Sequence, residues 1–156
     1  MSERTPTPAA TAFSGDYMAV GHLIGRARSS LLTGMDAELE PFGLTGAQFA
    51  VLKNVADGTA ETAADLCRTM HYDTGSMTRM LDRLEEKSVL RRERCTQDRR
   101  VVYLRMTSTG TELLPQLRTA VVRVIERHLH GFSPAEVDAL KLYLARMIQN
   151  SVAVTP

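Results

Sequence analysis

The chain alternates between stretches with helical periodicity and one stretch with strand periodicity. Between residues 14 and 40, apolar residues recur every three or four positions, which predicts a long helix with one apolar stripe. The same spacing predicts further helices over about 46–57, 62–70, 109–130 and 134–150, and in the first half of 73–107. The stripe of the first helix comprises Tyr17, Val20, Ile24, Ala27, Leu31, Met35 and Leu39.

Several of these helices begin at residues suited to a helix N-terminus. Thr45 precedes Gln48 by three positions, and Thr62 precedes Asp65 by the same spacing, which is the pattern of a capping box. A proline at the first helical position marks the start of the last helix. The residues expected at the helix starts are Thr45, Thr62, Asp73, Thr109 and Ser133.

The periodicity changes after the helix that begins at Asp73. Val89–Arg94 and Val101–Met106 have strand character, and the polar segment 95–100 between them predicts a hairpin. The two helices before the hairpin are separated by the tight turn 71–73. This order predicts a mainly α-helical protein with a small β-wing, in which 45–107 form a winged helix-turn-helix lobe.

Charge is distributed unevenly along the chain. Residues 74–107 contain nine basic and five acidic residues, a net charge of +4, whereas residues 1–73 contain five basic and nine acidic ones, a net charge of −4. The total of +1 conceals this asymmetry. Positive charge is concentrated in the predicted helix and hairpin, which favours a nucleic-acid-binding surface there.

Composition narrows the class of protein further. With 156 residues, 44% of them hydrophobic, the chain can form one domain, expected over 13–150, after a flexible tail at 1–12. The sequence has neither a signal peptide nor a membrane-spanning run, so a cytoplasmic protein without membrane contact is expected. Trp is absent and aromatic residues make up only 5%, which disfavours stacking on single strands and favours double-stranded DNA as partner.

Two short motifs resemble those of a known family. Asp98, Arg99 and Arg100, followed by Thr107 and Gly110, resemble the wing signature of the MarR family of bacterial regulators, and residues 78–84 resemble its recognition helix. The resemblance extends over about 14–150 in element order. It implies a ligand-responsive DNA-binding regulator without a cofactor, most often a homodimeric repressor that binds a palindromic operator.

The sequence departs from the family pattern at two positions. Met106 stands where the family usually has Leu, an apolar exchange of small effect. Ser88 stands where many members have Gly, so the end of the recognition helix is expected to be less cleanly left-handed.

The resemblance also implies roles for individual residues in DNA binding. Arg99 or Arg100 at the wing tip would enter the minor groove. Asp98 would repel phosphate, so we expect it to brace an arginine or cap the turn. For Arg79 and Arg83 the alternative is a solvated helix face. The residues expected in or beside the major groove are Thr74, Ser76, Thr78, Arg79 and Arg83.

The remaining helices are expected to serve dimerisation and effector binding. Helices over about 14–40, 109–130 and 134–150 are too apolar to stand alone beside a small lobe, which predicts a homodimer. By resemblance, a small-molecule effector such as a phenolic or aromatic carboxylate would bind between these helices and the lobe. The alternative for His22 and Arg26 is a solvent-facing or dimer-contact position. The residues expected at the effector site are His22, Arg26, Phe49, Leu52 and Lys53.

Other functions find less support in the sequence. Cys95 lies near wing arginines that could lower its pKa, so a thiol-redox regulator is one alternative, whereas Cys67 is expected in the core. Cys67 and His71 form only an incomplete metal motif, and His128 and His130 face different sides of a helix. Nucleophile, zinc-hydrolase and nucleotide-binding motifs are absent, so no enzyme is expected. A winged helix used only for protein contacts is the second alternative.

Overall fold

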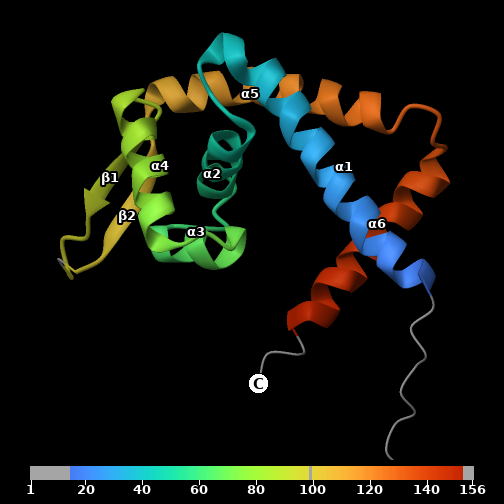
Figure 1. Cartoon of the computed structure of the whole chain (residues 1–156). Helices are drawn as coiled ribbons and strands as arrows, with labels where there is room; N and C mark the ends of the chain where they lie inside the picture. The colour runs from blue at the N-terminus through green and yellow to red at the C-terminus, as the bar shows by residue number, and fades with distance from the viewer. Residues whose placement is uncertain (1–14, 99, 153–156) are drawn as a thin grey trace, which may run out of the picture.

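The computed structural model describes residues 15–98 and 100–152, and the predicted tail at 1–12 lies outside them. As predicted, the chain is mainly α-helical with one two-stranded antiparallel sheet (Figure 1). The elements are α1 (Gly15–Leu39), η1 (Glu40–Phe42), α2 (Gly46–Ala56), α3 (Ala63–Met70), α4 (Thr74–Glu86), β1 (Leu90–Arg94), β2 (Val102–Met106), α5 (Ser108–His128) and α6 (Pro134–Val152).

The helices from α2 to α4 and the hairpin form a lobe at one end of the molecule (Figure 1). Its core combines apolar residues of every element, so burial fixes the orientation of α4 and of the hairpin together. The end of α1 and the stretch 113–121 of α5 complete this core. Fully buried side chains include Leu39, Leu52, Leu66, Met77, Leu81, Leu84, Leu90, Leu104 and Leu117.

The predicted capping boxes are present. The Thr45 hydroxyl accepts the Gln48 N–H at 3.2 Å, and the Gln48 side chain accepts the Thr45 N–H at 3.1 Å. Thr62 and Asp65 form the same reciprocal pair at the start of α3. The expectation for α5 was wrong by two residues, because Thr107 is its N-cap and accepts the Gly110 N–H at 3.0 Å.

The end of α4 differs from the expectation based on Ser88. Ser88 has φ of 54°, so it adopts the left-handed conformation although it is not glycine. Its N–H donates to the carbonyl of Glu85 at 2.8 Å, and the Val89 N–H donates to that of Leu84 at 3.2 Å. These two bonds form a complete Schellman motif, and the buried Val89 and Leu84 provide its apolar contact.

The wing pairs β1 with β2 in antiparallel register, with Arg92 opposite Leu104 and Arg91 opposite Arg105. Side chains alternate between the two faces of a strand, so Arg92 shares the inner face with the buried Leu90 and Leu104. The outer edge of β2 is covered as well, because the Leu104 N–H donates to the carbonyl of Glu61 at 2.7 Å.

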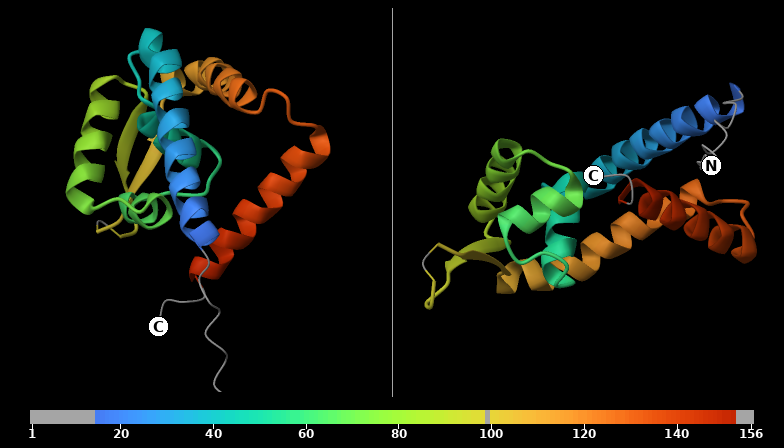
Figure 2. Two further views of the ribbon diagram at one scale, coloured as in Figure 1. Left: turned by 45° about the vertical axis from the view of Figure 1, so that its right-hand side comes forward. Right: turned by 90° about the horizontal axis from the view of Figure 1, so that it is seen from below.

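The remaining helices extend away from the lobe, and α6 turns back from the end of α5 (Figure 2). Helices α1 and α5 are joined by Glu38, which accepts hydrogen bonds from Arg123 at 3.1 Å and from Arg127 at 2.7 Å. A groove of about 610 Å³ lies between α1, α5 and α6 and is lined almost entirely by apolar side chains. Over the described residues, none of the helices has the length and apolar character that spanning a membrane requires.

Candidate nucleic-acid interface

Helix α4 has one buried and one exposed side. Met77, Leu81 and Leu84 face the core and are at most 1% exposed. The opposite side carries exposed Thr74, Thr78, Arg79 and Arg83, and Ser76 is half-buried at its margin. The five residues expected to approach DNA therefore lie on the solvent side of one helix, where they can reach a groove together.

The N-terminus of α4 is capped by Asp73, as the sequence predicted. The Asp73 carboxylate accepts the N–H of Ser76 at 2.9 Å. Hydrogen bonds from the backbone and then the side chain of Ser76 hold the pKa of Asp73 below its usual value. The cap stays ionised near neutral pH, and a Cβ on the neighbouring Gly75 would lie only 3.3 Å from the capping carboxylate.

A small polar pocket separates α4 from the start of α2. Its volume is about 240 Å³, and Arg79 and Arg83 line one side of it while Thr45 and Gln48 line the other. Arg79 also donates to the hydroxyl of Ser76 at 3.3 Å. Arg79 and Arg83 thus lie beside the capped N-terminus of α2, and both are exposed to solvent.

The wing turn is closed by Asp98. Its side chain accepts the N–H of Arg100 at 3.0 Å, and its carbonyl accepts the N–H of Val101 at the same distance. The Asp98 N–H donates to the Sγ of Cys95 at 3.4 Å. Arg100 is exposed, whereas Arg99 lies outside the described residues.

The basic residues of 74–107 fall into two groups. Among the described residues, Arg91 pairs with Glu93 at 3.2 Å, and Arg92 pairs with Asp82 and Glu85. Arg105 lies over the ring of Tyr103, 4.8 Å from its centroid. Within 74–107, the described arginines that form no ion pair with another described residue are Arg79, Arg83, Arg94, Arg100 and Arg105. Their charges remain available to an anionic partner.

Arg92 is a residue whose role the sequence reasoning missed. Burial lowers the pKa of its guanidinium, but the hydrogen bond to Asp82 and the charge of Glu85 outweigh burial, so the pKa is raised. The signal was present in the alternation of β1, which places Arg92 on the same face as Leu90. An arginine on the buried face of a strand needs acidic partners on the element that covers it.

The structure does not bring together the five residues expected at an effector site. Phe49 and Leu52 are 7% and 0% exposed in the core of the lobe, and Lys53 pairs with Asp57 at 2.7 Å. His22 and Arg26 are exposed on α1. The physical reason is that α2 begins against the last turns of α1, where Gly46 donates its N–H to Asp36 at 2.7 Å, and not against its middle.

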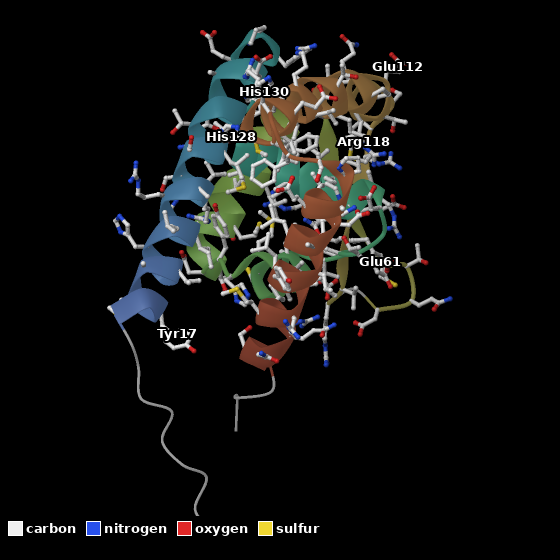
Figure 3. All side chains as sticks on the ribbon, turned by 90° about the vertical axis from the view of Figure 1, so that its right-hand side faces the viewer. Tyr17, Glu61, Glu112, Arg118, His128 and His130 are labelled. Atoms are coloured by element: carbon white, nitrogen blue, oxygen red, sulfur yellow. The ribbon has the colours of Figure 1, made fainter. Side chains whose placement is uncertain are left out.

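The cysteines and histidines occupy separate places. Cys67 is half-buried against the core, and Cys95 is half-buried at the end of β1. The Nε2 of His128 is hydrogen-bonded to the Oγ of Ser30 on α1 at 2.9 Å, and His130 follows α5 (Figure 3). Within 15–98 and 100–152, no group of three or more His, Cys, Asp or Glu side chains could hold a metal ion.

Comparison with known proteins decides the family. A sequence model described as the MarR family matches residues 44–102, which run from the start of α2 into β2. The structure of a MarR mutant from E. coli complexed with operator DNA has 26% sequence identity to this chain and a TM-score of 0.76, covering 85% of this chain and 95% of its own. The chain belongs to the MarR family. It is a DNA-binding transcriptional regulator with a winged-helix fold.

Two further MarR-family structures extend the comparison. BpsR of Bordetella bronchiseptica, described as regulated in its DNA binding by 6-hydroxynicotinic acid, is 27% identical with a TM-score of 0.72, over 83% of this chain and 92% of its own. A MarR-family regulator from Rhodococcus sp. RHA1 is 21% identical with a TM-score of 0.77, over 84% of this chain and 93% of its own. This likeness supports the fold alone. The MarR fold is therefore shared along the length that contains both the lobe and the terminal helices.

Proposed function

We propose that this MarR-family protein is a homodimeric repressor that binds a palindromic operator and is released by a small aromatic acid. The observation that carries the proposal is the arrangement of arginines without ion-pair partners among the described residues. Arg79 and Arg83 lie on α4 and Arg100 at the wing, on two adjoining elements of one lobe. Arginines held in this way can reach two neighbouring grooves of one duplex.

The proposed contacts follow from the side on which each residue lies. The exposed side of α4, with Thr74, Ser76, Thr78, Arg79 and Arg83, enters the major groove. Arginine can grip guanine with two hydrogen bonds there, which is worth about 1–3 kcal/mol of discrimination between bases. Arg100, or its neighbour Arg99, enters the adjacent minor groove from the wing. Asp98 closes the turn beneath them and does not contact DNA.

The dimer is proposed to form through α1, α5 and α6. Large apolar side chains are exposed on both terminal helices, among them Leu23 on α1 and Leu142 and Ile148 on α6. Helix α6 makes no extensive contact with another element of the described chain. An apolar surface of this extent is unfavourable in water, and a second copy would cover it symmetrically. A stable monomer in light scattering at micromolar concentration would refute this part.

The proposed effector contacts are reduced to His22 and Arg26. Phe49 and Leu52 are buried in the core of the lobe, and Lys53 forms an ion pair with Asp57. Both remaining side chains are exposed and have no ion-pair partner in the described part of the chain. An arginine can bind a carboxylate through two parallel hydrogen bonds. Benzoate, 4-hydroxybenzoate and 6-hydroxynicotinic acid should be titrated against the DNA complex. If these acids release DNA from the Arg26→Ala variant as readily as from the wild type, Arg26 does not bind the effector.

The experiment that tests the whole proposal is selection of bound DNA from a random duplex pool. A homodimer with one α4 in each major groove should select a palindrome whose half-sites lie about one helical turn apart. Arg79→Ala and Arg83→Ala should each lose preference at defined base positions. If wild-type protein enriches no sequence at physiological salt, the lobe is not a sequence reader and a protein-contact role replaces it.

A further inference from the structure

Arg92 contacts three successive turns of α4. Its guanidinium donates to the carboxylate of Asp82 at 2.7 Å and to that of Glu85, and it lies 3.4 Å from the backbone carbonyl of Thr78. These three residues are four and three positions apart, so they line one flank of the helix. A single side chain of β1 therefore spans most of the length of α4.

The backbone of β1 is attached to the same helix at the same point. Arg92 pairs with Leu104 across the hairpin, and its N–H points out of the ladder and donates to Glu85 at 2.8 Å. Glu85 thus accepts hydrogen bonds from both the main chain and the side chain of Arg92. The Arg92 side chain is only 30% exposed, so solvent competes with these bonds less than it does at the other wing arginines.

We infer that Arg92 is a positioning residue, which fixes the wing at the angle to α4 that lets both elements contact one duplex. The hydrogen bonds of its guanidinium are made to α4, so it contributes no phosphate contact of its own. It also neutralises Asp82 and Glu85, two acids on the flank of the helix that reads DNA. The inference rests on the proposed DNA contacts of α4 and the wing.

The neighbouring arginine provides a matched control. Arg91 follows Leu90 on the opposite face of β1, is 64% exposed and pairs only with Glu93 among the described residues. It carries the same charge on the same strand without a hydrogen bond or ion pair to α4. A role that depends on charge alone would make Arg91 and Arg92 equivalent, whereas a positioning role makes only Arg92 sensitive.

The test is a double-mutant cycle between Arg92→Ala and Glu85→Ala, measured by fluorescence anisotropy with the duplex selected from the random pool and with a scrambled duplex. Each single variant should weaken binding to the selected duplex about tenfold, and the double variant should be no weaker than either, because both remove one contact. Binding to the scrambled duplex should stay as in the wild type. Arg92→Lys should not restore binding, since one ammonium group cannot reach all three acceptors.

Other results would overturn the inference. A hundredfold loss in the double variant, together with weaker binding of Arg92→Ala to the scrambled duplex, would make Arg92 a direct phosphate contact. Wild-type binding by Arg92→Ala, or an equal loss in Arg91→Ala, would also refute it. Circular dichroism melting checks that each variant is folded. If Arg92→Ala does not fold, Glu85→Ala removes the same contact from the α4 side. Arg79→Ala and Arg100→Ala test the proposed interface separately, so its failure would be recognised independently of Arg92.

Discussion

Gly110 lies so close to Val89 that no side chain fits between them. A Cβ placed on Gly110 would overlap the carbonyl oxygen of Val89 and lie 2.9 Å from its carbonyl carbon. The same region is joined by the Thr107 N–H, which donates to the Val89 carbonyl at 3.3 Å. The first turn of α5 is therefore packed directly on the backbone that connects α4 to the wing.

This contact predicts that Gly110→Ala is strongly destabilising. The added methyl group meets main-chain atoms that cannot rotate away, so either α5 or the start of β1 must shift, at a cost of about 1–3 kcal/mol or more. Urea denaturation followed by circular dichroism would measure the loss. Thr109→Ala, at an exposed position of the same turn, is the control and should change stability little. Equal stability of Gly110→Ala and wild type would show that the helix is not packed as closely as described.

Ser88 offers a change in the opposite direction. A residue with a Cβ is strained at φ of 54°, by roughly 1 kcal/mol, and glycine is not. We expect Ser88→Gly to stabilise the protein by up to about 1 kcal/mol, since part of the gain is offset by the greater freedom of glycine in the unfolded chain. Ser88→Ala keeps the strain and serves as control. The difference between the two midpoints in urea is the measurement, and a less stable glycine variant would contradict the prediction.

Local rules predicted most of the fold. Thr45, Thr62 and Asp73 satisfy backbone donors within three residues of themselves, so their capping roles follow from sequence spacing alone. The start of α5 was misplaced because Thr107 and Thr109 are both acceptable N-caps locally. The choice between them depends on the packing of Gly110 against Val89, twenty-one residues away, which spacing does not reveal.

The candidate interface was less predictable than the fold. The residues on the solvent side of α4 follow from its period, because the apolar positions at Met77, Leu81 and Leu84 fix the opposite face. The role of Arg92 depends on the hairpin register and on which element covers its inner face. The expected effector residues failed to meet for a similar reason: the crossing point of α1 and α2 is set by tertiary packing, and an amphipathic pattern gives the face of a helix but not the turn at which it is crossed.

The Glu38 cluster predicts a pH-dependent contribution to stability. Hydrogen bonds from Arg127 and then Arg123 lower the pKa of Glu38 from its ordinary value of 4.5. Because the folded-state pKa is the lower one, this stabilisation is complete above about pH 4.5 and is lost as the pH falls through the folded-state value. We therefore expect Glu38→Gln to be less stable than wild type at neutral pH and to approach it in acid.

Urea denaturation of both proteins at neutral pH and at about pH 3.5 would measure this convergence. The difference between the two proteins is the informative quantity, since Asp57, Asp65 and Asp73 also have lowered pKa values and destabilise both alike in acid. Glu112→Gln, at an exposed acid of α5, is the control and should track the wild type throughout. A difference that does not vary with pH would mean that Glu38 has the same pKa in the folded and unfolded protein, so that Arg123 and Arg127 do not stabilise its carboxylate.

The wing prediction concerns Arg100 and the salt dependence of DNA binding. Arg100 is exposed, and its guanidinium has no acidic partner among the described residues, so in the complex its charge would displace counterions from DNA. Arg100→Ala should weaken operator binding and reduce the slope of log K against log salt by about 0.9 for each protomer bound. Titrations between about 50 and 200 mM salt would give the slope. Gln97→Ala changes an exposed, uncharged side chain of the same turn and should preserve it. If Arg100→Ala keeps both the affinity and the slope of the wild type, the wing does not lie on the DNA, and the proposed pairing of major-groove and minor-groove contacts fails with it.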